Sequence, residues 1–199
     1  MVSFRVVPTQ FISDSELLKG NFLVPEGENS FPGICKFHGL PGSPDQVSGI
    51  ASRLAAAGFV VLTFDFRGFR SNGGLFSLAN EVEDARNAVS YLLKLKQVMK
   101  DWVGVYGASY GGAVAVLAAS EIQQISPRPV LIITGDADKE IKLDGVRSFC
   151  DSAKQPKKLV VIEGADHELT NPEAFEESNE TAVNWFKQLK KRLEYSHNC

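Results

Sequence analysis

From about residue 30 onward, short apolar runs alternate with segments in which apolar residues recur every three or four positions. Apolar segments of strand length lie at 31–37, 59–64, 102–106, 130–134 and 159–162. The run at 59–64 is continuous, which is typical of a strand buried on both faces of a parallel sheet. Segments with helical spacing separate the runs, so the pattern predicts repeated strand–helix units.

Three of the intervening helices have clear start or stop signals. The first is expected to begin at Ser43, with Pro44 in its first turn, and to end at Gly58. A second, at 78–98, repeats apolar residues every three or four positions, with acidic residues early and lysines late. The last is expected to start at Asn171. Between them the pattern predicts a helix at 110–120 and a weaker one between residues 134 and 159.

The first thirty residues have a different organisation. Two strands, at 2–7 and 17–24, are joined through a polar turn at 13–15. An antiparallel start followed by strand–helix units predicts an α/β fold with a mostly parallel sheet and helices on both faces. The sequence contains no repeat and no linker, so we expect a single domain over 1–199 without a separate cap.

Composition narrows the class of protein. The 199 residues are 44% hydrophobic and 23% charged, with a net charge of −3, so we expect neither nucleic acid nor an anionic membrane as a partner. The three cysteines, Cys35, Cys150 and Cys199, have no CxxC pairing and indicate neither a disulfide framework nor a zinc site. Without a secretory leader or a long apolar run, a cytoplasmic location is expected.

A glycine-rich turn, Gly-Ala-Ser-Tyr-Gly-Gly at 107–112, lies between a predicted strand and a predicted helix. A GxSxG sequence in this context places the serine, Ser109, on a tight, exposed corner, and the glycines remove clashes with the backbone. The helix start behind it offers backbone N–H groups to a developing oxyanion. Ser109 is therefore a candidate nucleophile.

A serine nucleophile needs a base and an acid that orients it. In this architecture the three residues follow in the order serine, acid, histidine. His38 precedes Ser109, and His197 lies two residues from the last position, so His167 is the candidate base. Three acids qualify by position between Ser109 and His167, namely Asp136, Asp138 and Glu140.

These motifs together resemble the α/β-hydrolase superfamily, and most closely its dienelactone-hydrolase-like and serine-aminopeptidase-like small serine esterases. The resemblance covers nearly the whole chain. It is carried by segments 17–27, 31–43, 65–74, 107–112, 135–141 and 164–167.

The resemblance implies roles for further residues. Asp138 becomes the acid by its position in the loop, and the backbone N–H groups of Leu40 and Tyr110 become the oxyanion hole. His38 and Arg67 become loop braces rather than catalysts. A small acyl substrate is implied, and no metal or organic cofactor.

The chain is short after the nucleophile, because Asp138 lies only 29 positions after Ser109. Members of the superfamily usually place another strand there, and often a cap. We expect the sheet to close by pairing 130–134 directly with 103–106. The predicted function is a capless serine hydrolase acting on a small ester or thioester. The alternatives are an amidase or aminopeptidase, and a catalytically defective binding protein with the same fold.

Overall fold

The computed structural model describes residues 1–40, 47–70, 72–121, 129–153 and 156–196. The chain divides into two compact units, Met1–Ser126 and Pro127–Cys199. Within the described ranges, no helix is both long enough and apolar enough to cross a membrane.

The first unit contains a five-stranded mixed sheet in the order β1-β2-β4-β3-β5. β1 and β2 form an antiparallel hairpin, β2 pairs antiparallel with β4, and β3 pairs in parallel with β4 and β5. The predicted antiparallel start and parallel continuation are confirmed. The strands are β1 (Phe4–Ser13), β2 (Glu16–Pro25), β3 (Phe31–Phe37), β4 (Val60–Phe64) and β5 (Val98–Gly107).

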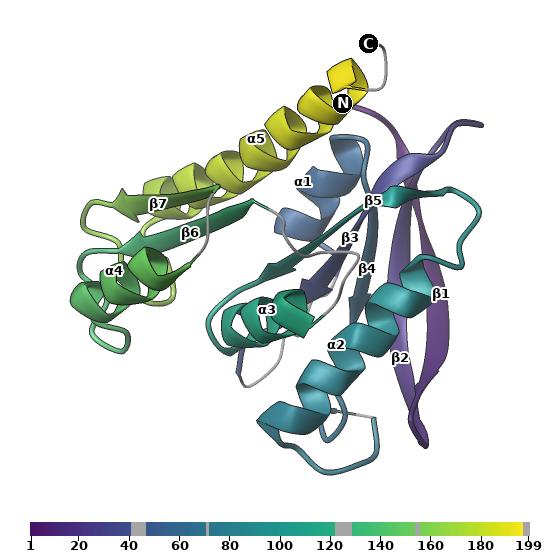
Figure 1. Cartoon of the computed structure of the whole chain (residues 1–199), viewed down its shortest axis with the longest axis horizontal. Helices are drawn as coiled ribbons and strands as arrows, with labels where there is room; N and C mark the ends of the chain where they lie inside the picture. The colour runs from purple at the N-terminus through teal and green to yellow at the C-terminus, as the bar shows by residue number, and fades with distance from the viewer. Residues whose placement is uncertain (41–46, 71, 122–128, 154–155, 197–199) are drawn as a thin grey trace. The chain divides into compact units, whose positions relative to one another are not determined.

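Helices cover both faces of this sheet, as predicted (Figure 1). Helix α1 (Ile50–Ala56) packs against β2 and β4, while α2 (Leu78–Leu92) and α3 (Tyr110–Glu121) lie on the other face. Alternate residues of each strand face the helices on the two sides of the sheet, because successive side chains of a strand point to opposite faces. The larger core lies under α2 and α3 and includes Phe37, Phe64 and Phe66.

Two predicted helix bounds in this unit are wrong. α1 begins at Ile50 rather than near residue 43, because residues 47–49 form a bend and a turn and Gly49 has a φ of 57°. The predicted cap at 43–46 lies outside the described residues. α2 ends at Leu92 instead of 98, and Val98 opens β5. The ammonium group of Lys100 binds the carbonyl oxygens of Leu93 and Leu95 just past the end of α2.

The second unit is a strand–helix–strand–helix segment. β6 (Val130–Gly135) and β7 (Lys157–Ile162) form a parallel two-stranded sheet. α4 (Leu143–Ser152) and α5 (Pro172–Ser196) each pack against both strands. Among its described residues, a core cluster contains the buried Ile162, Ala165 and Ala174.

The predicted pairing of 130–134 with 103–106 would join residues of the two units, and it stays a prediction. All six residues of β6 pair in parallel with β7. The strand–helix–strand segment of β6, α4 and β7 thus satisfies one side of the β6 ladder within itself.

Candidate active site

Ser109 occupies the turn between β5 and α3. Its φ of 50° is in the left-handed region, which is uncommon for a residue other than glycine. Its side chain is exposed, and its carbonyl oxygen accepts the N–H of Gly112 at 2.8 Å at the start of α3. Strained backbone of this kind is concentrated at functional sites.

The glycines on either side of Ser109 are required by close backbone contacts. A Cβ atom on Gly107 would lie 2.0 Å from the carbonyl oxygen of Gly111. A Cβ atom on Gly111 would lie 2.5 Å from the carbonyl oxygen of His38. No side chain fits at these distances, so the glycines of the GxSxG sequence have the steric role predicted for them.

The loop after β3 comes directly against this turn. A Cβ atom on Gly39 would lie 3.3 Å from Cβ of Ser109 and 3.1 Å from the carbonyl oxygen of Ala108. Leu40 follows Gly39, and Tyr110 follows Ser109. The first unit thus brings the segments of both predicted oxyanion-hole residues to the candidate nucleophile.

His38 is held by both of its ring nitrogens. Nδ1 lies 2.9 Å from the carbonyl oxygen of Gly39, and the N–H of Phe66 donates to Nε2 at 3.1 Å. These partners assign the proton to Nδ1. Burial lowers the pKa of His38, which keeps the ring neutral. The predicted bracing role is confirmed.

Arg67 braces the loop that follows β4. Its guanidinium donates to Asp84 at 2.6 and 2.9 Å, to Asp14 at 2.9 Å and to Ser13 at 3.1 Å. Arg67 and Asp84 are buried, so these charge-assisted bonds tie the loop to α2 and to the β1–β2 turn. The predicted structural role of Arg67 is confirmed.

Aromatic rings connect this loop to the nucleophile turn. His38 packs on Phe69, Phe69 on Phe76, and Phe76 on Tyr110, with ring centroids 4.9, 5.3 and 5.6 Å apart. We call Phe69, Phe76 and Tyr110 the aromatic wall. Phe76 is half exposed beside Tyr110. Our sequence reasoning missed the wall, although apolar residues in an otherwise polar loop were a signal for it.

Glu81 of α2 is fully buried near the Tyr110 hydroxyl. Burial raises the pKa of Glu81 to about 7, with the proximity of Tyr110 opposing the change. Within the described part of the chain, neither the Glu81 carboxyl oxygens nor the Tyr110 hydroxyl makes a hydrogen bond of normal geometry. A neutral carboxyl group is the form that such a site favours.

The second unit joins the candidate acid and base. His167 Nδ1 lies 2.9 Å from Asp138 Oδ2. The other Asp138 oxygen accepts the N–H groups of Glu140 and Ile141, each at 2.8 Å. Burial tends to raise the pKa of Asp138, but the bonds from Ile141, His167 and Glu140 lower it overall. The bond to Asp138 raises the pKa of His167, against a smaller effect of burial.

The other two candidate acids contact different groups. Asp136 accepts the N–H of Gly164 at 2.7 Å and so joins the loop after β6 to the loop after β7. Glu140 approaches the far side of the imidazole, with Oε2 at 3.6 Å from Nε2 of His167. Asp138 is thus the one of the three candidates bonded to Nδ1. His197 lies outside the described residues.

The mixed sheet with helices on both faces and the strand–turn–helix around Ser109 are features of the α/β-hydrolase fold. The family of X-Pro dipeptidyl-peptidases (S15 family) matches residues 14–127, more than half of the chain. The chain therefore belongs to the S15 family within the α/β-hydrolase superfamily.

Solved structures agree with this fold. Est1E from Butyrivibrio proteoclasticus, solved with ferulic acid bound, is 17% identical, with a TM-score of 0.77 over 92% of this chain and 98% of that one. The Pyrococcus furiosus esterase Pf2001 is 20% identical, with a TM-score of 0.77 over 94% of this chain and 93% of that one.

A curated relative extends well beyond the matched region. It is an uncharacterised 31.7 kDa protein from the traX–finO intergenic region of Escherichia coli, 32% identical over 121 residues. The match covers 57% of this chain and 42% of that protein. The chain thus spans less than half the length of this relative.

Proposed function

We propose that this chain is a serine hydrolase that cleaves a small carboxylic ester or thioester through an acyl-enzyme intermediate. The observation that carries the proposal is the 2.9 Å hydrogen bond between Asp138 and His167. With Nδ1–H bound to the carboxylate, Nε2 is the basic nitrogen, which is the tautomer a serine nucleophile needs. The proposal requires the two units to act as one catalytic domain.

Each residue of the proposed site has a distinct role in the reaction. Ser109 Oγ attacks the acyl carbon while His167 Nε2 takes its proton. The N–H groups of Leu40 and Tyr110 stabilise the oxyanion. His167 then protonates the leaving alcohol or thiol, and next activates the water that releases the acyl group. Asp138 holds the ring and stabilises the imidazolium, which matches the direction of the pKa change at His167.

The aromatic wall favours a substrate with an apolar acyl group. Phe76 packs on Tyr110, the residue after the nucleophile, and is half exposed. Leu40 and Leu75 are exposed as well. Est1E, which shares the fold, was solved with the aromatic ferulic acid. We therefore propose aromatic or medium-length apolar acyl esters as the preferred substrates.

Peptide hydrolysis is the second candidate, because the matched family is named for X-Pro dipeptidyl-peptidases. The match ends at residue 127, so it includes Ser109, Leu40 and Tyr110 but neither Asp138 nor His167. The nucleophile turn is common to ester and amide hydrolysis, so this match favours both reactions.

Two experiments separate these functions from a defective binding protein. Labelling by a fluorophosphonate probe, with Ser109→Ala as the control, tests for an activated serine. Wild-type labelling that disappears in Ser109→Ala supports a hydrolase, and equal absence in both rejects it. A panel of p-nitrophenyl esters beside X-Pro p-nitroanilides then identifies the reaction. Faster turnover of the anilides would replace the esterase proposal with the peptidase.

A further inference from the structure

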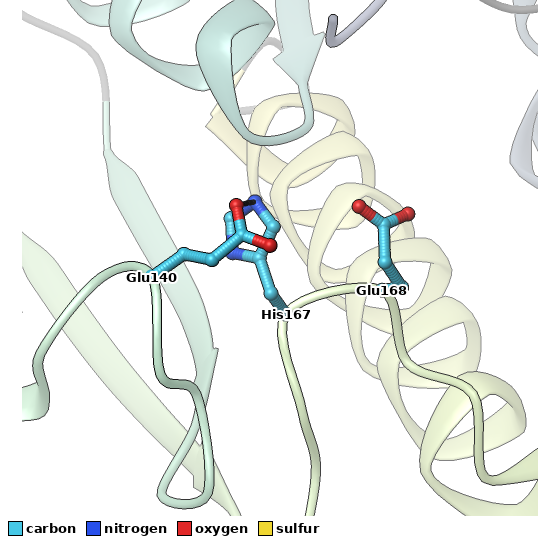
Figure 2. A group of neighbouring side chains, drawn as sticks. All are labelled: Glu140, His167 and Glu168. Carbon is cyan, nitrogen blue, oxygen red and sulfur yellow. Dashed lines mark ion pairs between the residues drawn. The ribbon is translucent and has the colours of Figure 1, made fainter.

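Three side chains with metal-binding groups meet on the loops that follow β6 and β7. They are Glu140, His167 and Glu168, shown in Figure 2. One ligand atom from each lies within 4.8 Å of the other two. All three belong to the second unit, so the arrangement depends on that unit alone.

The spacing fits a small tetrahedral ion. Zinc binds imidazole nitrogen and carboxylate oxygen at about 2.0–2.2 Å, so two such ligands at a tetrahedral angle are about 3.4 Å apart. His167 Nε2 and Glu140 Oε2 are 3.6 Å apart. Glu168 is exposed, and its carboxylate lies within 4.8 Å of the other two ligand atoms.

A separate observation concerns the other ring nitrogen. A histidine that binds a metal usually gives its second N–H to a carboxylate or a carbonyl, which fixes the ring and directs the remaining nitrogen at the ion. Asp138 makes this bond to Nδ1 at 2.9 Å and is itself fixed by the backbone N–H groups of Glu140 and Ile141. The bond to Asp138 thus gives the ring of His167 the same support that a metal-binding histidine has.

We propose that Glu140, His167 and Glu168 bind a divalent transition-metal ion, with Zn²⁺ as the reference ion, and that the ion inhibits hydrolysis. One imidazole and two carboxylates suit zinc better than calcium or magnesium, which prefer oxygen ligands alone. The inhibition rests on the proposed function. A lone pair of Nε2 that is bound to zinc cannot accept the proton of Ser109, and removal of the ion restores the base.

Binding is measured first, by isothermal titration calorimetry of the whole chain with Zn²⁺. His167→Ala should remove this site. Glu140→Gln and Glu168→Gln should each weaken binding at least about tenfold, and Asp138→Asn about 10- to 100-fold through the ring orientation. Glu173→Gln, an exposed glutamate in the first turn of α5, is the matched control and should bind as wild type does.

Inhibition is measured as the ratio of ester hydrolysis with and without Zn²⁺ for each variant. The zinc concentration that halves the rate should follow the calorimetric affinity of wild type, Glu140→Gln and Glu168→Gln, and a chelator should reverse the effect. Mg²⁺ at the same concentration should not inhibit.

The outcomes for the site and for the reaction are separate. Absence of zinc binding in wild type, or wild-type affinity in both glutamate variants, overturns the metal site. Binding that depends on the three residues, in a protein that hydrolyses no substrate and takes no fluorophosphonate label, supports the site and rejects the proposed function.

Discussion

Asp138 and His167, at the ends of neighbouring strands in the second unit, are joined by a 2.9 Å hydrogen bond. The bond fixes which imidazole nitrogen carries the proton. It also identifies Asp138, rather than Asp136, as the partner of His167. The order of residues along the chain does not make this choice.

Replacement of His167 tests the base. His167→Ala should lower the turnover of p-nitrophenyl esters by at least about a thousandfold, the scale found when a member of a serine triad is removed. The control is His197→Ala, which should leave turnover near the wild-type value. If His197→Ala were instead the damaging change, His167 would not be the base.

Replacement of the two aspartates tests the acid. Asp138→Asn should keep the fold and lower kcat by about 10⁴-fold, because an amide favours the wrong tautomer of the ring. Asp136→Asn keeps a carbonyl oxygen for the N–H of Gly164 and should lower kcat far less. Steady-state kinetics with circular dichroism distinguishes the two, and the reverse ranking would transfer the role to Asp136.

Alanine at Gly111 and alanine at Gly112 should change the free energy of unfolding in opposite directions. Gly111→Ala places a methyl group 2.5 Å from the carbonyl oxygen of His38 and should lower the free energy of unfolding by about 3 kcal/mol. At Gly112 the nearest atom is 3.4 Å away, an ordinary contact. Gly112→Ala should therefore stabilise α3 by about 0.5–1 kcal/mol. Denaturant unfolding measures both, and equal effects would contradict the steric argument.

Glu81 predicts a dependence of stability on pH. Its pKa rises from 4.5 to about 7 in the folded protein, so between these values the folded state holds a proton that the unfolded state has lost. Stability should consequently fall as the pH rises through this window, by at most about 1.4 kcal/mol per pH unit. Glu81→Gln should remove this part of the slope.

The comparison is made by urea unfolding at several pH values. Glu83→Gln, on the same helix, is the control and should follow the wild-type curve. A Glu81→Gln curve parallel to wild type would show that Glu81 does not titrate in this window.

Phe76 tests the aromatic wall. Phe76→Ala should raise KM for p-nitrophenyl esters of aromatic acids about tenfold relative to the acetate, because a large acyl group loses an apolar contact. Phe149→Ala, at a similarly exposed phenylalanine on α4, should leave this ratio unchanged. An equal effect on both esters would place the acyl group away from the wall.

Local patterns predicted most of the fold. The strand at 31–37 and the start of the last helix at Pro172 are confirmed because apolar periodicity and proline placement act within a few residues. The start of α1 was predicted wrongly, because Gly49 adopts a φ of 57° that the helix-start signal at 43–46 does not indicate. The glycines around Ser109 could be interpreted from the sequence, since their role is steric and local.

Side-chain contacts across long separations were harder to predict. The sequence left Asp136, Asp138 and Glu140 equivalent by position, and the resemblance to a family favoured Asp138. The contact between Glu81 and Tyr110 had no sequence signal, because a glutamate on an amphipathic helix usually faces water. The proposed metal site of Glu140, His167 and Glu168 was also missed, since these residues do not follow a recognisable ligand spacing.

The two-stranded sheet of β6 and β7 has a consequence for the durability of catalysis. Among the described residues, the core cluster of this sheet has three buried members, Ile162, Ala165 and Ala174, fewer than the cluster of the first unit. The orientation of the proposed base therefore depends on the smaller of these two described clusters. Heat or denaturant should disorder the proposed base while the tightly packed turn around Ser109 is still folded. Loss of catalytic activity would then be an early sign of unfolding.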